Sequence, residues 1–233
     1  MNILAIESSA KTLNVAIKTE TTYCSTLDFS LGMTSETIMP RILDLCSRAN
    51  IGLNQIEIVA CSRGPGSFTS LRVGMATAKG IATALSIPLV SIDTLELYHY
   101  PVRHIEMVKA VVVDARKQRF YCALFDRNGR LTEDLDATCE EFVRYMCDYA
   151  RVFVTGPDVQ LFKTSIDASE TLSKQPVELI IDELTHRDYG ESLAIMALAK
   201  FRTEGPDHIG SGPTYIRKSD AELVRLSSAS TRQ

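Results

Sequence analysis

Short apolar runs separated by polar turns open the chain. Runs of strand length occupy residues 1–8, 13–19 and 23–29, and the connections between them are short. Three strands in this succession predict an antiparallel meander. After Ser35, a residue type that favours helix N-caps, the apolar positions follow helical spacing to about residue 50 and predict a helix.

A strand, a glycine-rich turn and a long helix come next. Residues 56–61 form a short apolar run that leads directly into Arg63-Gly64-Pro65-Gly66. A helix is expected from Phe68 to Leu85, because Pro88 prevents its continuation and another strand, 89–92, follows.

The second half of the chain repeats this order in a shorter form. Asn128-Gly129 predicts a hairpin turn, because this pair tolerates positive φ. The expected elements are a helix start at Asp93-Thr94, strands at 109–114 and 120–126, a helix at 139–149, a strand at 152–155, a short helix near Val159, a strand at 178–182 and a helix at 189–203. We predict two related α/β units, residues 1–103 and 104–204, the second of them smaller. A tail, residues 205–233, packs back on them and is frayed at its end.

Composition narrows the class of protein. The 233 residues are enough for a substantial core, and a net charge of −4 argues against non-specific binding of nucleic acid by the whole surface. We expect neither a secretory signal nor a transit peptide from the N-terminal residues, and no stretch approaches the roughly 18–20 apolar residues of a membrane span. The six cysteines lack C-x-x-C spacing, which argues for reduced core thiols and against structural zinc. We expect a cytoplasmic protein.

The glycine turn stands where a phosphate cradle would stand, between a strand and a helix N-terminus. A P-loop needs a lysine followed by Ser or Thr at a fixed distance, and neither Gly64 nor Gly66 is followed by one. A dinucleotide-binding G-x-G-x-x-G also fails, since Thr69 stands at the third glycine. An anion cradle and a tight turn stiffened by proline both stay open, and we favour the turn.

The helix after the turn has two stripes. The stripe suited to covering a sheet comprises Leu71, Gly74, Ala78, Ile81, Ala82 and Leu85. The second stripe is made mostly of small residues, namely Val73, Thr77, Gly80 and Ala84. A glycine inside a helix costs about 1 kcal/mol relative to alanine, which is easiest to explain where another backbone comes close. We therefore expect the second stripe to face another helix, of this chain or of a partner, and we favour a partner.

The run from Gly64 to Gly80, GPGSFTSLRVGMATAKG, closely resembles the signature of the TsaB (YeaZ) family. Four further segments are similar to motifs of that family. They are residues 3–9, Ser35-Glu36-x-x-x-Pro40, Asp114-Ala115-Arg116-Lys117 with Tyr121, and Pro213-x-Tyr215-Ile216-Arg217. The resemblance covers nearly the whole chain.

The resemblance implies an actin/Hsp70/sugar-kinase-like (ribonuclease H-like) fold with two related α/β domains, the second reduced. It implies a non-catalytic subunit that binds the catalytic subunit TsaD, with the ATPase TsaE joining the assembly. TsaD transfers a threonylcarbamoyl group to the adenosine beside the anticodon (position 37) of tRNA, so tRNA would be bound only through the complex. The chain alone would be a homodimer.

The resemblance also implies where partners dock, on a surface that the homodimer and TsaD share. Its candidate residues are Ser35, Glu36, Met39, Pro40, Leu43, Phe68, Thr69, Arg72, Val73, Thr77, Gly80 and Ala84. Candidates for a vestigial phosphate or nucleotide contact are Glu7, Ser8, Ser9, Gly64 and Gly66. Glu7, Thr34 and Ser70 depart from the family pattern, which usually has aspartate, histidine and glycine there.

We predict no catalytic residue, no metal and no required cofactor in this chain, with ATP and magnesium used by the partner complex. The four histidines lack metal-binding spacing, and no nucleophile motif is present. Glu7 and Asp114 end strands where related kinases hold magnesium, but we interpret them as turn caps. The alternatives are a stand-alone ATP-binding phosphotransferase or ATPase of the same fold, and a glycoprotease-like metallopeptidase.

Basic residues gather between residues 103 and 130. Five of them, Arg116, Lys117, Arg119, Arg127 and Arg130, would cluster if residues 120–126 form a hairpin arm. Arg116, Lys117 and Arg119 are candidates for contact with tRNA phosphates. An ordinary solvated hairpin is the alternative, and we favour it.

Overall fold

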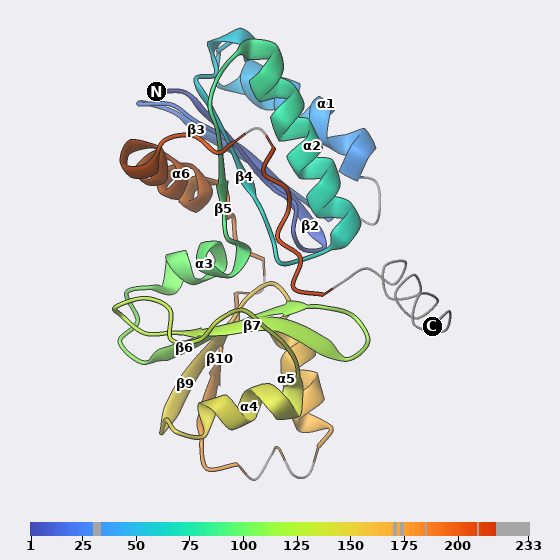
Figure 1. Ribbon diagram of the computed structural model, residues 1–233, viewed down its shortest axis with the longest axis vertical. Helices are drawn as coiled ribbons and strands as arrows, with labels where there is room; N and C mark the ends of the chain where they lie inside the picture. The colour runs from blue at the N-terminus through green and yellow to red at the C-terminus, as the bar shows by residue number, and fades with distance from the viewer. Residues whose placement is uncertain (30–33, 170–171, 173–174, 185, 209, 218–233) are drawn as a thin grey trace, which may run out of the picture.

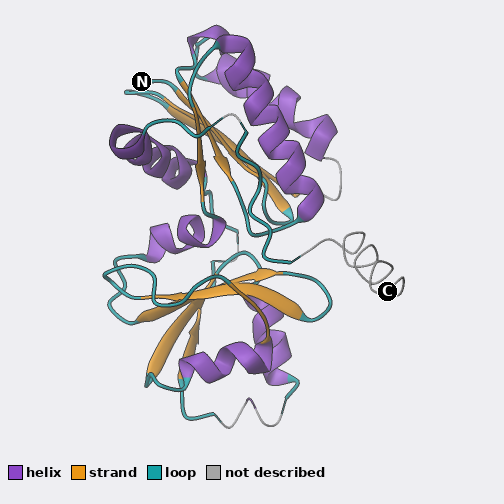
Figure 2. Cartoon of the chain, in the orientation of Figure 1, coloured by secondary structure: helices purple, strands orange, loops and turns teal. Residues whose placement is uncertain are grey.

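The computed structural model describes residues 1–29, 34–169, 172, 175–184, 186–208 and 210–217 (Figure 1). Two five-stranded sheets form the frame of the molecule, one above the other in this view, and helices cover them (Figure 2). The helices are α1 (Thr34–Arg48), α2 (Phe68–Leu85), α3 (Thr94–His99), α4 (Cys139–Met146), α5 (Val159–Asp167) and α6 (Gly190–Glu204), with 3₁₀ turns η1 (Leu53–Gln55) and η2 (Tyr100–Val102). Among the described helices, none has the length and apolar character needed to cross a membrane.

The first sheet has the strand order β3-β2-β1-β4-β5. Its strands are β1 (Ile3–Glu7), β2 (Thr12–Lys18), β3 (Tyr23–Phe29), β4 (Ile58–Ser62) and β5 (Leu89–Ile92). The first three form the expected antiparallel meander, and β4 and β5 extend the sheet parallel to β1. Alternate residues of β1 serve two faces: Leu4 and Ile6 pack under α1 and α2, and Ile3 and Ala5 pack under α6.

The second sheet repeats the first. Its strands are β6 (Val108–Asp114), β7 (Arg119–Phe125), β8 (Leu135–Thr138), β9 (Arg151–Thr155) and β10 (Glu178–Ile181). β7 and β8 extend it on one side of β6 as antiparallel partners, and β9 and β10 extend it on the other side as parallel ones. The covering helices α4 and α5 have 8 and 9 residues, whereas α1 and α2 have 15 and 18. The prediction of two related units with the second reduced is confirmed.

Two helices pack on the unit to which the sequence order does not assign them. α3 follows β5 but contacts β6 and β7, and α6 follows β10 but contacts β1, β2 and β5. We had expected α6 to close the second unit. It lies on the first sheet instead, because its buried Leu193, Ala194 and Ala197 form one apolar cluster with Ala5 and Ala16, whose small side chains allow close approach. The same cluster reaches Val111 and Phe125 of the second sheet, so the two units share part of their core.

The Asn128-Gly129 pair does form a tight turn, in which the Asp126 amide donates to Gly129 O (2.8 Å) and Gly129 has φ of 131°. The strand that returns from it, β8, was not predicted. β8 is only four residues long and half polar, so it lacks an apolar run that the sequence could reveal.

Candidate protein-interaction face and interdomain pocket

The glycine turn between β4 and α2 is a place where three backbone segments cross. A Cβ on Gly64, which has φ of 105°, would stand 2.6 Å from the carbonyl oxygen of Thr214. A Cβ on Gly66 would overlap the carbonyl oxygen of Ser9. The Ser67 amide donates to that Ser9 oxygen (2.7 Å), and the Thr214 amide donates to Arg63 O (2.7 Å). Both glycines are therefore required by close approach of the chain's own backbone.

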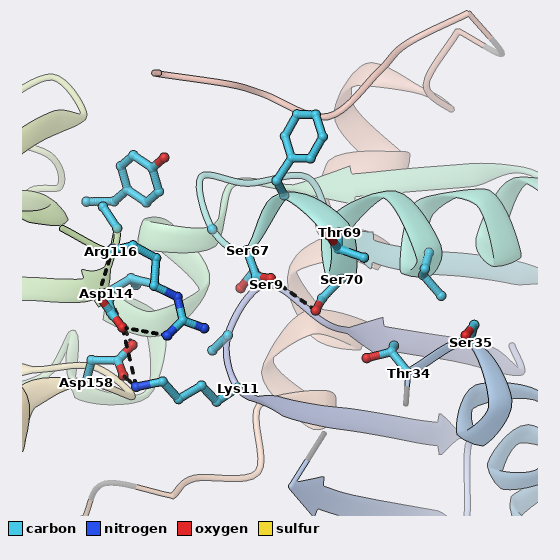
Figure 3. Close-up of a pocket in the computed structure, with 17 residues that line it drawn as sticks. Ser9, Lys11, Thr34, Ser35, Ser67, Thr69, Ser70, Asp114, Arg116 and Asp158 are labelled. Carbon is cyan, nitrogen blue, oxygen red and sulfur yellow. Dashed lines mark hydrogen bonds and ion pairs between the residues drawn. The ribbon is translucent and has the colours of Figure 1, made fainter. Parts of the chain in front are cut away.

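A pocket of about 480 Å³ opens between the two units, at the N-terminal ends of α1 and α2 (Figure 3). The first unit lines it with Ser9, Ala10, Lys11, Thr34, Ser35, Gly66, Ser67, Phe68, Thr69, Ser70 and Val73, and the second with Val113, Asp114, Ala115, Arg116, Tyr121 and Asp158. Of the five residues predicted for a vestigial phosphate contact, only Ser9 and Gly66 are among them. Glu7, Ser8 and Gly64 do not line the pocket.

The charged groups of the pocket are paired with one another. Lys11 Nζ lies 3.1 Å from Asp158 and 3.4 Å from Asp114, which joins the first unit to the second (Figure 3). Burial alone would lower the pKa of Lys11, but the carboxylates of Asp158 and Asp114 outweigh burial and raise it. Arg116 lies 3.6 Å from Asp114 as well. A phosphate entering here would meet two carboxylates and cations that are already engaged.

Glu7 points into the core of the first unit. Its Oε1 accepts hydrogen bonds from the amide (2.7 Å) and the hydroxyl of Ser9, and that hydroxyl is 2.8 Å from the Tyr98 hydroxyl. Glu7 Oε2 has no partner among the described residues. Burial raises the pKa of Glu7 although these hydrogen bonds oppose the shift. In the part of the chain that the structure describes, no group of three or more His, Cys, Asp or Glu could hold a metal ion.

His99 is fixed by packing between the units. Its ring stacks on Phe125 with centroids 4.4 Å apart. Burial, together with the nearby charges of Lys109 and Arg103, lowers the pKa of His99 to about 4. It is therefore a neutral, half-buried histidine at physiological pH.

α1 and α2 lie side by side on the first sheet and present one outer surface (Figure 1). We call the twelve interface candidates listed from the sequence the α1–α2 face. Leu43 is 54% and Phe68 36% exposed, and Pro40, Gly80 and Ala84 are exposed too. Met39, Val73 and Thr77 are half-buried. The structure thus brings these candidates to one side of the molecule.

The two glycines inside α2 have different surroundings. A Cβ on Gly74 would overlap the Ser8 hydroxyl, so the close packing of α2 on the first sheet explains this glycine. A Cβ on Gly80 would meet nothing within 4 Å. No described segment of this chain accounts for the small residue at position 80.

After α6 the chain runs back over the first unit to the second. We call residues 206–217, of which 209 is outside the described residues, the strap. At its start the Asp207 amide donates to Leu89 O (2.8 Å), and Asp207 accepts from the Ser91 amide (2.8 Å) and from Lys200 (3.0 Å). At its end Arg217 donates to Asp136 (2.8 Å) and to Ala115 O (3.2 Å) of the second unit. The predicted frayed end, residues 218–233, lies outside the described residues.

The basic residues of the second unit do not form one cluster. Arg116, Lys117 and Arg119 lie at one end of β7, and Arg127 and Arg130 lie beyond its other end, about 20 Å away for a strand of this length. Several are paired with acids: Arg119 with Asp136 and Glu141, and Arg130 with Asp93, Glu96 and Asp134. The five-residue cluster considered from the sequence does not form, because β7 separates its members.

The duplicated sheet with a pocket between its two units defines a protein of the actin-like, ribonuclease H-like fold class. One solved structure, "YeaZ from Pseudomonas aeruginosa", has the same fold: it superposes with a TM-score of 0.72 at 23% identity, over 92% of this chain and 99% of that one. A family model described as "TsaD: tRNA N6-adenosine threonylcarbamoyltransferase" matches residues 33–168.

Similarity to curated proteins extends over the full length of the chain. The Bacillus subtilis "tRNA threonylcarbamoyladenosine biosynthesis protein TsaB" is 27% identical over 98% of this chain and 99% of that protein. A "tRNA N6-adenosine threonylcarbamoyltransferase" of Symbiobacterium thermophilum is 30% identical over 57% of this chain but only 41% of its own length. The chain belongs to the family that the TsaD model describes, and within it to the TsaB (YeaZ) group.

Proposed function

We propose that this chain is a non-catalytic subunit in the synthesis of threonylcarbamoyladenosine in tRNA, and that it acts by docking the catalytic subunit TsaD on its α1–α2 face. The observation that carries the proposal is Gly80. This glycine costs about 1 kcal/mol in a helix, yet a Cβ there would meet nothing. A helix of another protein molecule is the simplest reason to keep position 80 free of a side chain.

The interdomain pocket supports a role without chemistry of its own. Its lysine and carboxylates neutralise one another, and Glu7 faces the core instead of the pocket. A phosphotransferase of this fold would also need its two units to close on a substrate. Here an apolar cluster continuous from Ala5 to Phe125 joins the units, and a large apolar interface opposes such motion.

The partners follow from the family. TsaD supplies the transferase, TsaE joins as an ATPase, and ATP and magnesium are used by that complex. Alone, the chain forms a homodimer through the same face. Binding of tRNA is indirect, since the net charge of −4 gives the surface no general attraction for phosphates. Arg116 and Lys117 remain candidates for a local contact. We propose a cytoplasmic location, where tRNA is modified.

Reconstitution of threonylcarbamoyl transfer tests this function. TsaD, TsaE, tRNA, threonylcarbamoyl-adenylate, ATP and magnesium are combined with this chain omitted and then restored, and modified adenosine is quantified by mass spectrometry. We expect transfer near background without the chain and recovery in proportion to the chain added. Transfer that does not depend on the chain would overturn the proposal.

Two measurements on the purified chain test the alternatives. Turnover of labelled ATP with magnesium by the chain alone would favour a phosphotransferase or ATPase. Bound zinc or iron in elemental analysis, together with chelator-sensitive peptide cleavage, would favour a metallopeptidase. We expect neither result.

A further inference from the structure

Arg72 is held flat on the surface by two aromatic rings. Its guanidinium carbon lies 3.8 Å from the centroid of Phe68 and 5.6 Å from that of Tyr215, a residue of the strap. Its Nε donates to the Tyr215 hydroxyl (2.8 Å), and the rings of Phe68 and Tyr215 are 5.0 Å apart. These contacts fix the plane of the guanidinium, and none of them uses its two terminal nitrogens.

Among the charged side chains of α1 and α2, one cation and one anion have no ion pair within the described residues. Arg41 pairs with Asp28, Arg48 pairs with Asp44, and Lys79 donates to Ser211 O. Within the described residues, Arg72 on α2 and Glu36 on α1 have no ion pair, and both are exposed. A flat, pre-oriented arginine fork matches a carboxylate with two parallel hydrogen bonds.

The two groups lie at the same end of the α1–α2 face. Ser35 at the start of α1 and Thr69 at the start of α2 both line the interdomain pocket, so the two helices begin side by side (Figure 3). A two-fold axis along the helices would set α1 of one copy against α2 of the other with their N-terminal ends together. Glu36 of each copy would then face Arg72 of the other, which gives two equivalent ion pairs.

We propose that Arg72, oriented by Phe68 and by Tyr215 of the strap, is the ionic anchor of the α1–α2 face, and that in the homodimer it receives Glu36 of the second copy. This inference rests on the proposed function, which assigns self-association to the same face. It adds the ion pair, the direction of the two-fold axis and a role for the strap. A carboxylate is favoured over nucleic-acid phosphate because Arg72 is the one cation among the twelve residues of the face, and the other charged residue among them is the anion Glu36.

A charge exchange tests the pair, with dimer dissociation constants measured by sedimentation equilibrium. Arg72→Glu and Glu36→Arg each place like charges together and should weaken the dimer on the order of a hundredfold. The double variant should bind within about tenfold of the wild type. Arg127→Glu, the same change in an exposed turn of the second unit, should have no effect. Tyr215→Ala should weaken the dimer several-fold by releasing Arg72.

The outcomes separate this inference from the function on which it rests. A wild-type chain that does not self-associate would overturn both the homodimer and the ion pair. A wild-type dimer that Arg72→Glu does not weaken would overturn the anchor alone. If Arg72→Glu weakens the dimer and Glu36→Arg fails to restore it, the assignment of Glu36 is wrong. Melting curves of every variant confirm that the chain is folded.

Discussion

At the scale of single residues, Glu7 shows how a carboxyl group at a strand end can lose any link to a ligand. The residue ends β1 as expected, but its additional methylene, relative to the aspartate usual in the family, belongs to a side chain that is fully buried. One oxygen is bound by Ser9 and the other has no described partner. When such a buried carboxyl group is charged, it lowers the free energy of unfolding.

Glu7→Gln should therefore stabilise the protein at neutral and alkaline pH. Burial raises the pKa of Glu7 in the folded state above its usual 4.5. The stability contributed by the protonated group is fully present below the unfolded pKa and is lost as pH rises through the folded pKa. Glutamine does not titrate, so the gap in unfolding free energy should grow with pH, to about 1–3 kcal/mol.

Urea unfolding between pH 4.5 and pH 8 measures this gap. Glu20→Gln, on the surface, serves as the control and should show only a small change. A gap for Glu7→Gln that is the same at every pH would contradict the assignment of a raised pKa.

At the scale of elements, the sequence predicted α2, β3 and β5 to the residue. α2 and β5 have a strong apolar pattern, and Pro88, between them, ends the helix. β3 alternates only weakly, and the succession of short runs at the start of the chain predicted it. It did not predict β8, which is short and half polar, or the packing of α6 on the first sheet. Periodicity shows that a helix has an apolar stripe, but it does not show which of two similar sheets the stripe covers.

The second stripe of α2, which contains Gly80, gives a prediction in which the melting temperature and the dimer dissociation constant respond differently to one substitution. Leucine is a better helix former than glycine, and a Cβ at position 80 meets nothing in the described chain. Gly80→Leu should therefore leave the melting temperature unchanged or raise it. The same side chain would separate α2 from a docked helix and weaken self-association by at least about tenfold.

Thr83→Leu is the matched control on the same helix. Thr83 is exposed, lines a surface hollow with Phe201 of α6 and Pro206, and is not one of the twelve residues of the α1–α2 face. The Thr83→Leu variant should have the same dimer dissociation constant as the wild type in sedimentation experiments. An unchanged dissociation constant for Gly80→Leu would show that the second stripe of α2 does not dock a partner.

At the scale of the whole molecule, the two units are joined by several links far apart in the sequence. They share the apolar cluster from Ala5 to Phe125, and Lys11 bridges to Asp114 and Asp158. Some pocket residues, such as Ser9, Gly66 and Arg116, were already candidates for ligand contact from the sequence. The pairing of Lys11 with Asp158 and the path of the strap could not be predicted from the sequence. Only the folded chain brings together segments that are 100 or more residues apart.

The strap is the last of these links, and its end is held by Arg217. This arginine and Arg119 both donate to Asp136, and together they lower the pKa of that carboxyl although burial opposes the shift. Arg217→Ala should release the end of the strap, with a loss of about 1–2 kcal/mol in unfolding free energy.

Hydrogen exchange followed by mass spectrometry should detect that release before any global unfolding. Faster exchange is expected in residues 210–217, where the Thr214 amide donates to Arg63 O, with α4 and α5 unaffected. Arg127→Ala in the exposed turn is the control and should exchange as the wild type does. If Arg217→Ala leaves exchange in the strap unchanged, the bond to Asp136 does not hold it, and the contacts of Asp207, Ser211, Thr214 and Tyr215 are sufficient to fix the segment. Because Tyr215 of the strap also orients Arg72, the dimer dissociation constant of Arg217→Ala shows whether release of the strap weakens association through the α1–α2 face.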